Sequence, residues 1–153
     1  MNAALVAIGD EIVAGLTTDT NSGWIAGELR AVGVEPVAGF AVTDDEDAIV
    51  RTLERALEEA EFVVCTGGLG PTADDLTTAC VARLAGRPLV MHEESLAHIE
   101  GIFRARGIEM PANNRKQALV PEGCTVIPNP TGTAPGVICP VERGGRTCFV
   151  ACL

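Results

Sequence analysis

Apolar runs alternate with stretches of helical periodicity along the first two thirds of the chain. The apolar runs at 3–9, 37–42 and 61–66 predict three strands, and the near-continuous first and third runs are typical of strands buried on both faces. Candidate N-caps at 19–22 predict a helix that bears Trp24, Ile25 and Leu29 and ends at Gly33. Thr43 and Asp44 open a second helix, whose apolar residues repeat every three or four positions up to Ala60.

The second half continues the alternation and then changes character. The pattern predicts a helix from about Thr72 to Gly86, a strand at 89–91, a helix ending near Gly107, a short helix at 113–119, a strand at 125–127, and strands at 137–141 and 147–153. Gly144-Gly145 between the last two strands indicates a hairpin. We therefore expect one α/β domain over residues 1–153, with three layers, a mainly parallel sheet and an antiparallel edge hairpin.

The net charge of the chain limits the kinds of ligand that it can bind. The 153 residues hold 21 acidic and 11 basic side chains, a net charge of −10, and Lys116 is the only lysine. This balance and the 3% aromatic content argue against a nucleic-acid partner. Residues 1–100 carry 18 of the acids and 5 of the bases. A bound anion would need a metal ion, backbone amides or the basic group Arg104, Arg106, Arg115 and Lys116.

The sequence contains no apolar run long enough to span a bilayer and no basic region before its first apolar stretch, so we expect no membrane partner and a cytoplasmic location. Its six cysteines form no C-x-x-C pair, and neither His92 nor His98 stands at ligand spacing from one. Small buried hydrophobes are the expected role of these thiols.

Three predicted strands end in acidic or glycine-rich turns, at 9–11, 43–45 and 67–75. Ligands of parallel sheets bind at the carboxyl ends of the strands, and glycines followed by a helix N-terminus can surround a phosphate. Asp74 and Asp75 fall in the first turn of the predicted helix, where they could simply offset the helix dipole. Beside a phosphate they instead suggest a divalent cation, Mg²⁺ or Mn²⁺.

Other motifs fit less well. Residues 68–73 satisfy the glycine fingerprint of dinucleotide folds, with Glu93 or Glu94 about 20 residues further on. That fingerprint belongs on the first strand of its unit, however, and this copy follows the third. No phosphate-loop motif occurs, and no G-x-S-x-G elbow supports a serine nucleophile.

Five motifs in a fixed order resemble the amino-terminal domain of the competence/damage-inducible protein A (CinA) family. They are Gly9–Gly15, Asp19–Ser22, Thr66–Thr77, Asn113–Ala118 with Pro121–Gly123, and Asn129–Gly136. The resemblance implies a three-layer MoaB/Mog-like fold that binds molybdopterin or an adenylated relative at the strand ends. In the CinA branch it implies metal-dependent hydrolysis of ADP-ribose to AMP and ribose 5-phosphate, with Mg²⁺, Mn²⁺ or Co²⁺.

The resemblance also implies roles for individual residues. Asp75, Asp44 and Lys116 are the expected catalytic residues, and Asp44, Asp74 and Asp75 the expected metal ligands. The expected ligand-binding residues are Gly9, Asp10, Glu11, Asn21, Thr66, Gly67, Gly68, Gly70, Thr72, Arg115, Asn129, Gly132 and Thr133. Superfamily members are commonly dimers or trimers, so a homo-oligomer is expected.

Two departures from the family pattern qualify this expectation. CinA proteins usually continue after the last strand into a Leu-Pro-Gly-Val-Pro loop and a deamidase domain, whereas this chain stops at Ala151-Cys152-Leu153. We therefore expect no deamidase activity, and a fragment, frameshifted product or degenerate copy of the family. A non-catalytic nucleotide- or molybdopterin-binding module is the alternative to the hydrolase.

Overall fold

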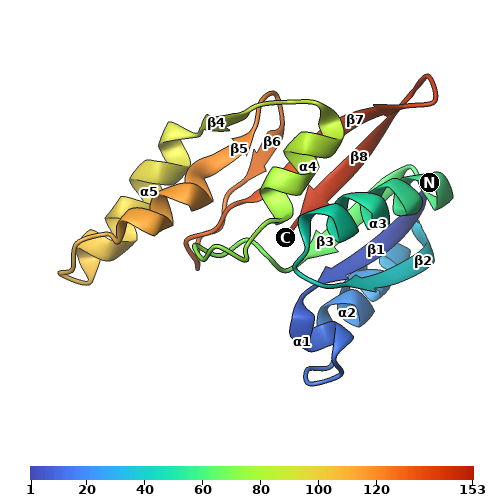
Figure 1. The fold of residues 1–153 in the computed structure, drawn as a ribbon, viewed down its shortest axis with the longest axis horizontal. Coiled ribbons are helices and arrows are strands. Elements are labelled where there is room, and N and C mark those ends of the chain that lie inside the picture. Colours follow the sequence, from blue (N-terminus) through green and yellow to red (C-terminus); the bar gives the residue numbers. More distant parts are fainter.

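A six-stranded mixed sheet with helices on both faces forms the body of the molecule in the computed structural model, which describes residues 1–153 (Figure 1). The elements are β1 (Asn2–Ile8), α1 (Asp10–Val13), α2 (Thr20–Ala31), β2 (Glu35–Val42), α3 (Glu46–Glu59), β3 (Phe62–Thr66), α4 (Thr77–Ala85), β4 (Leu89–Met91), α5 (Glu93–Ala105), a 3₁₀ helix (Ala112–Ala118), β5 (Leu119–Pro121), β6 (Thr125–Ile127), β7 (Gly136–Arg143) and β8 (Arg146–Cys152).

The strand order is β2-β1-β3-β8-β7-β6. β1 runs parallel to β2 and β3, β3 runs parallel to β8, and β6, β7 and β8 pair in antiparallel fashion. The predicted three-layer fold with a mainly parallel part and an antiparallel hairpin is thereby confirmed. The hairpin turns at Gly144 and Gly145, both with positive φ, and β6 rather than the hairpin forms the outer edge.

The main core lies between the sheet and helices α3 and α4. Helix α3 buries Ile49, Leu53, Ala56 and Leu57 on one stripe, as the periodicity predicts, while its opposite face stays charged. The opposite sheet face is covered by α2 through Ile25, which packs with Leu5 and Val64. Phe149 of β8 remains 41% exposed, and Trp24 of α2 points away from the core at 68% exposure.

A smaller lobe carries the rest of the chain. β4 and β5 form a separate two-stranded antiparallel sheet, and α5 packs on the 3₁₀ helix through Leu96, Ile99 and Ala118. Figure 1 shows this lobe on the left, well away from β1 and β2. It is joined to the body by the segments that flank α4 and β6, so its residues can face the carboxyl edge of the sheet.

Three sequence predictions about local structure were inaccurate. Helix α4 starts at Thr77 instead of near Thr72, and Asp45 instead of Thr43 or Asp44 caps α3 by accepting from the Ala48 amide at 2.8 Å. The expected loop after β1 contains the four-residue helix α1. At α3 several polar residues could act as the cap, and Asp45 is the one whose side chain reaches the free amide. Helix α4 instead begins after Leu76 and has no side-chain cap.

All six cysteines are free thiols; Cys124 is half-buried and the other five are buried. Burial raises the pKa of Cys139 to about 11. The predicted role of small buried hydrophobes is confirmed for these five, and the absence of disulfides agrees with their spacing.

None of the helices combines the length and apolar character needed to cross a membrane.

Candidate functional site at the carboxyl edge of the sheet

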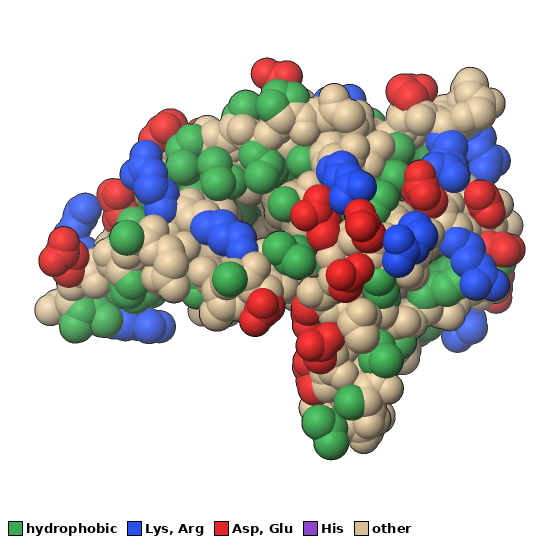
Figure 2. All heavy atoms as spheres, viewed as in Figure 1, with side chains coloured by type: hydrophobic (Ala, Val, Ile, Leu, Met, Phe, Trp, Pro, Cys, Tyr) green, Lys and Arg blue, Asp and Glu red, His purple; other side chains and the backbone are tan.

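The three acidic or glycine-rich turns lie together, as the topology predicts. β2, β1 and β3 are adjacent and parallel, so their carboxyl ends share one edge of the sheet. The Gly9 amide donates to the Val42 carbonyl at 2.9 Å, which joins the ends of β1 and β2. Figure 2 shows acidic side chains running along this part of the surface, from the start of α3 to the projecting α1.

The segment Gly67–Thr72, here called the glycine turn, is closed so tightly that two positions require glycine. Gly67 and Gly68 have φ of 95° and 66°, in the left-handed region. A Cβ at Gly67 would stand 2.1 Å from the Ile8 carbonyl oxygen, and one at Gly68 would stand 2.3 Å from Thr77 Oγ1. Thr77 is fully buried and its hydroxyl donates to the Gly67 carbonyl at 2.7 Å, which fixes the turn to α4.

Asp75 closes the other end of the glycine turn. Its Oδ2 accepts from the Thr72 amide at 2.8 Å and from the Thr72 hydroxyl at 2.6 Å. Partial burial opposes ionisation of this carboxyl, but the hydrogen bonds from Thr72 and the Gly70 backbone, together with the charge of Lys116, outweigh it and lower the pKa of Asp75. The expected place of Asp74 and Asp75 in the first helical turn is wrong, because both precede α4, which begins at Thr77.

Asp10 and Asp44, here called the acid pair, clamp the ends of β1 and β2 to each other. The Asp10 amide donates to Asp44 Oδ2 at 3.0 Å, and the Asp44 amide donates to Asp10 Oδ1 at 3.0 Å. One oxygen of each carboxylate is used in this way, and the second oxygen is available to a ligand. The residues are 34 positions apart, so only the strand register brings them together.

The 3₁₀ helix of the lobe contacts the glycine turn from the opposite side. Lys116 Nζ donates to the Thr72 carbonyl at 2.5 Å, and the amide of Gln117 donates to the Leu69 carbonyl at 3.2 Å. Gln117 is buried and also accepts from Asn114 Nδ2 at 2.9 Å. The lobe therefore delivers the chain's only lysine to the turn and fixes it there with two amide side chains.

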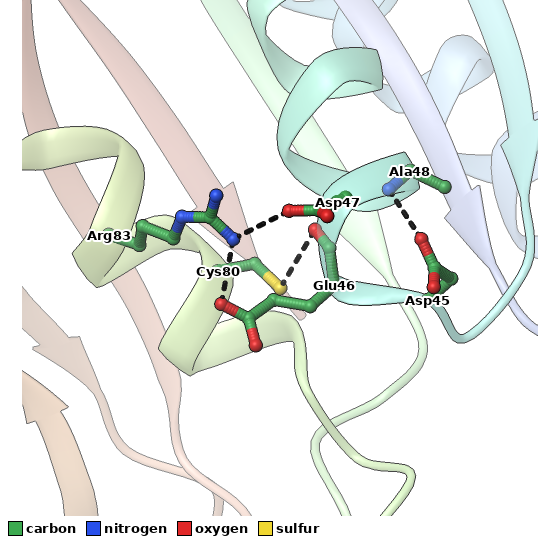
Figure 3. A network of polar contacts seen from close by, with 6 residues as sticks. All are labelled: Asp45, Glu46, Asp47, Ala48, Cys80 and Arg83. Carbon is green, nitrogen blue, oxygen red and sulfur yellow. Dashed lines mark hydrogen bonds and ion pairs between the residues drawn. The ribbon is translucent and has the colours of Figure 1, made fainter.

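Helices α3 and α4, which follow Asp44 and Asp75 in the chain, are tied to each other (Figure 3). Arg83 Nη1 lies 2.8 Å from Glu46 Oε1 and 2.9 Å from Asp47 Oδ1. Cys80 Sγ lies 3.8 Å from the Glu46 carbonyl, and burial, reinforced by the charge of Glu46, raises the pKa of Cys80 to about 11. These contacts hold the first turn of α3 against α4.

Two hollows beside the glycine turn are lined by six of the thirteen predicted ligand-binding residues. One, of about 180 Å³, is lined by Glu11, Asn21, Thr66 and Gly67 together with residues of the α1–α2 loop. The other, of about 40 Å³, is lined by Gly68, Gly70, Asp75 and Lys116 among others. The first hollow contains Gly67 of the glycine turn, and the second contains Gly68 and Gly70 of the same turn.

Four of the predicted residues lie away from both the hollows and the glycine turn: Arg115, Asn129, Gly132 and Thr133. Asn129 and Thr133 line a third cavity beside α5, and Gly132 belongs to the same loop. Arg115 is exposed and lines neither of the two hollows. No three Asp, Glu, His or Cys side chains are grouped so as to hold a metal ion, so Asp44, Asp74 and Asp75 do not form a preassembled cluster.

Sequence reasoning did not single out Asn114, Gln117 or Thr77, although all three act on the glycine turn. Their neighbours Lys116 and Asp75 drew notice because they are charged, whereas these side chains are neutral. The sequence offered one signal. A polar residue at a position that the helical pattern predicts to be buried needs a hydrogen-bond partner.

The fold, with the glycine turn at its strand ends, is of the MoaB/Mog type, and the comparisons agree. Residues 4–153 match the family described as "Probable molybdopterin binding domain". MoaB from Pyrococcus furiosus, described as a tungsten cofactor synthesizing protein, superposes with a TM-score of 0.63 at 21% identity, covering 99% of this chain and 80% of that one. At this identity the likeness concerns the fold alone.

More similar relatives identify the branch. CinA from Thermoplasma acidophilum superposes with a TM-score of 0.86 at 38% identity, over 99% of this chain and 86% of that one. A CinA-like protein of Thermomicrobium roseum is 47% identical over 147 residues, 95% of this chain and 36% of the relative. The chain belongs to the CinA family. It spans about a third of the length of the curated relatives it matches.

Proposed function

We propose that this domain binds a nucleotide at the carboxyl edge of the sheet and hydrolyses the diphosphate of ADP-ribose-like nucleotides to AMP and a sugar phosphate. The observation that carries the proposal is the position of the glycine turn, which lies between the acid pair of Asp10 and Asp44 on one side and Lys116 on the other. Carboxylates and a lysine around a backbone cradle suit a phosphoanhydride and a cation.

The donor set fits a divalent cation, although through other residues than the expected trio. Mg²⁺ is commonly held by one or two carboxylates, with water and substrate phosphate completing its shell. Asp10 and Asp44 each have one oxygen available for this, and Asp44 is the residue that this arrangement shares with the expected set. Asp75 Oδ2 already accepts two hydrogen bonds from Thr72, so the role of Asp75 in the proposal is to shape the turn.

A cation held there would polarise the diphosphate and lower the pKa of a bound water. The chain's own groups then have separate tasks. Amides of the glycine turn orient the phosphates, and Lys116 neutralises charge on the phosphate that leaves. Water adds to phosphorus, the P–O–P bond breaks, and the two products are AMP and ribose 5-phosphate.

The experiment incubates the purified protein with ADP-ribose and Mg²⁺, Mn²⁺ or Co²⁺ and measures AMP by chromatography. We expect AMP release that Asp44→Asn lowers at least a hundredfold, because a cation ligand is lost. Glu61→Gln is the control, since Glu61 is an exposed carboxylate just before the amino end of β3, away from the carboxyl edge, and the activity of this variant should equal that of the unaltered protein. Absence of release with all three metals would overturn the hydrolase proposal.

A non-catalytic nucleotide- or molybdopterin-binding module is the second candidate. The observation in its favour is that Asp44, Asp74 and Asp75 are not assembled into one cluster. Calorimetric titration with AMP, ADP-ribose and a pterin separates the candidates, because saturable binding without AMP release supports the module.

A further inference from the structure

Two cysteines face each other at the outer edge of the six-stranded sheet. β6 and β7 pair in antiparallel fashion, with Thr125 opposite Ile138. The next step along this register places Cys124 opposite Cys139. Both thiols lie on the same face of the sheet, because Cys139 belongs to the main core and Cys124 packs against that core.

The spacing of this pair suits a disulfide. Residues directly opposite each other on antiparallel strands have Cα atoms about 4.5–5.5 Å apart, and a disulfide needs a Cα separation of about 4.4–6.8 Å. Opposite side chains on such strands also point to the same face, so the two sulfur atoms can meet without a change of register. Bond formation therefore requires side-chain rotation but no rearrangement of β6 and β7.

Cys124 gives an oxidant access to the pair. It is half-buried, whereas the other five cysteines, Cys139 included, are buried. Cys124 directly follows the turn at Glu122 and Gly123, which links β5 to β6. A small oxidant such as hydrogen peroxide therefore reaches Cys124 first, and Cys139 is placed to react with the product.

The guanidinium of Arg87 lies over the same turn. Its Nη1 donates to the Glu122 carbonyl at 2.7 Å, and a Cβ at Gly123 would stand 2.6 Å from this nitrogen. Burial raises the pKa of Cys124 and of Cys139, and the positive charge of Arg87 opposes the rise at both thiols. Arg87 thus favours the thiolate, which is the form that attacks an oxidant.

We propose that Cys124 and Cys139 are a modification site, at which a peroxide oxidises the two thiols to a disulfide. The Cys124 thiolate attacks one peroxide oxygen, the O–O bond breaks, and the departing hydroxide takes the proton that Cys124 released. The product is a sulfenic acid. The Cys139 sulfur then attacks the Cys124 sulfur, the S–O bond breaks, and hydroxide leaves as water with the Cys139 proton. The two thiols lose two electrons, which reduce one peroxide to two waters.

The bond joins the lobe to the six-stranded sheet. Cys124 follows β5 of the lobe, and Cys139 belongs to β7 of the larger sheet. The 3₁₀ helix that carries Lys116 to the glycine turn continues directly into β5. Oxidation therefore closes the segment 124–139 into a covalent loop at the base of the lobe. No ligand takes part, so the pair reacts whether or not the glycine turn binds a nucleotide.

Peptide mapping tests the bond itself. The purified protein is treated with millimolar hydrogen peroxide, its remaining thiols are blocked with iodoacetamide, and the tryptic peptides are weighed. Cleavage after Lys116 and Arg143 releases the peptide 117–143, which contains Cys124, Cys139 and no other cysteine. We expect this peptide to escape alkylation and to lose two hydrogen atoms. Arg87→Gln should slow the conversion at least threefold, and Arg83→Gln, whose ion pairs lie at Glu46 and Asp47, should not.

The same map shows the outcomes that overturn the proposal. Cys65 and Cys152 are the competing pair, because they are Cα partners on β3 and β8. Their bond would join the separate tryptic peptides 56–83 and 147–153. That cross-link in place of the expected one, full alkylation of peptide 117–143 after peroxide treatment, or oxidation that stops at Cys124 would each overturn the proposal.

Thermal melting of reduced and oxidised protein tests the effect on the fold. Oxidation should raise the melting temperature by about 4 °C or more, because the bond restricts the unfolded chain. Cys124→Ala and Cys139→Ala should each abolish this rise. Cys148→Ala is the matched control, since Cys148 is a buried strand cysteine opposite Val141, and it should keep the rise. Each variant is compared with its own reduced form, so a loss of packing cancels. Equal rises in all three variants would contradict the proposal.

Discussion

Replacing Asp75 with asparagine tests whether this carboxylate closes the glycine turn. In the structure Asp75 Oδ2 accepts two hydrogen bonds from Thr72, at 2.8 and 2.6 Å, next to the charge of Lys116. A hydrogen bond to a charged group contributes about 1.5–3 kcal/mol when buried. The turn is largely exposed, and asparagine can still accept one bond, so we expect Asp75→Asn to lower the free energy of unfolding by about 1–2 kcal/mol.

For a domain of this size, that loss corresponds to a melting temperature about 2–8 °C lower. The pH dependence adds a sharper expectation. Because the folded-state pKa of Asp75 is depressed, its stabilisation is complete above the ordinary aspartate pKa and is lost as the pH falls through the lower folded value. The difference between the two proteins should therefore be full at pH 6–7 and shrink below about pH 4.

The assay is urea unfolding at pH 7, 5 and 3.5, with Asp74→Asn as the matched control. Asp74 is the adjacent, exposed carboxylate without a bonding partner, so its variant should stay within about 0.5 kcal/mol of the unaltered protein. Equal destabilisation by the two variants, or a difference for Asp75→Asn that grows at pH 3.5, would refute the reasoning.

Three further predictions concern the packing around the site. Gly67→Ala should lower the free energy of unfolding by roughly 2 kcal/mol or more, because its Cβ would meet the Ile8 carbonyl at 2.1 Å at a left-handed φ; Gly33→Ala, at φ 82° with open space, should cost less in the same urea assay. Arg83→Gln should leave the melting temperature nearly unchanged in 0.5 M NaCl, because its ion pairs are exposed; a large drop there would contradict this. In the native protein a thiol reagent at pH 7.5 should modify Cys124 before any other cysteine, as peptide mapping can check, and early modification of a buried thiol would count against the packing.

The elements that could be predicted from the sequence are those whose burial leaves a regular pattern of apolar residues. β1 and β3 could be predicted as strands, because a strand that is buried on both faces has a continuous apolar run. The apolar stripe of α3 could be predicted because the opposite face of that helix is charged. The start of α4 could not be predicted, because the residue types of Thr72, Asp74 and Asp75 are all suited to an N-cap. None of the three caps the helix: Asp75 bonds back to Thr72, and α4 begins after Leu76 without a side-chain cap.

The candidate site also has a part that could be predicted from the sequence and a part that could not. Asp10, Asp44 and the glycines of the turn could be predicted as neighbours, because parallel topology brings their strand ends to one edge. The reciprocal bonds of the acid pair depend on strand register across 34 residues, which no local pattern reveals. In the sequence Glu94 was considered only for a dinucleotide fingerprint and His98 only for its spacing from the cysteines. On an isolated helix they look like ordinary surface residues, and only the packing of the loop at 128–135 makes them part of a cavity.

The central claim is that the edge around the glycine turn holds the diphosphate of a nucleotide between the acid pair and Lys116. The most direct measurement is calorimetric titration of ADP-ribose, with and without Mg²⁺, onto the unaltered protein and onto Lys116→Gln and Arg115→Gln. We predict saturable binding that Mg²⁺ strengthens and that Lys116→Gln weakens at least tenfold, with a smaller effect from Arg115→Gln, because Arg115 does not contact the turn. Binding that neither Mg²⁺ nor the loss of Lys116 alters would contradict the claim.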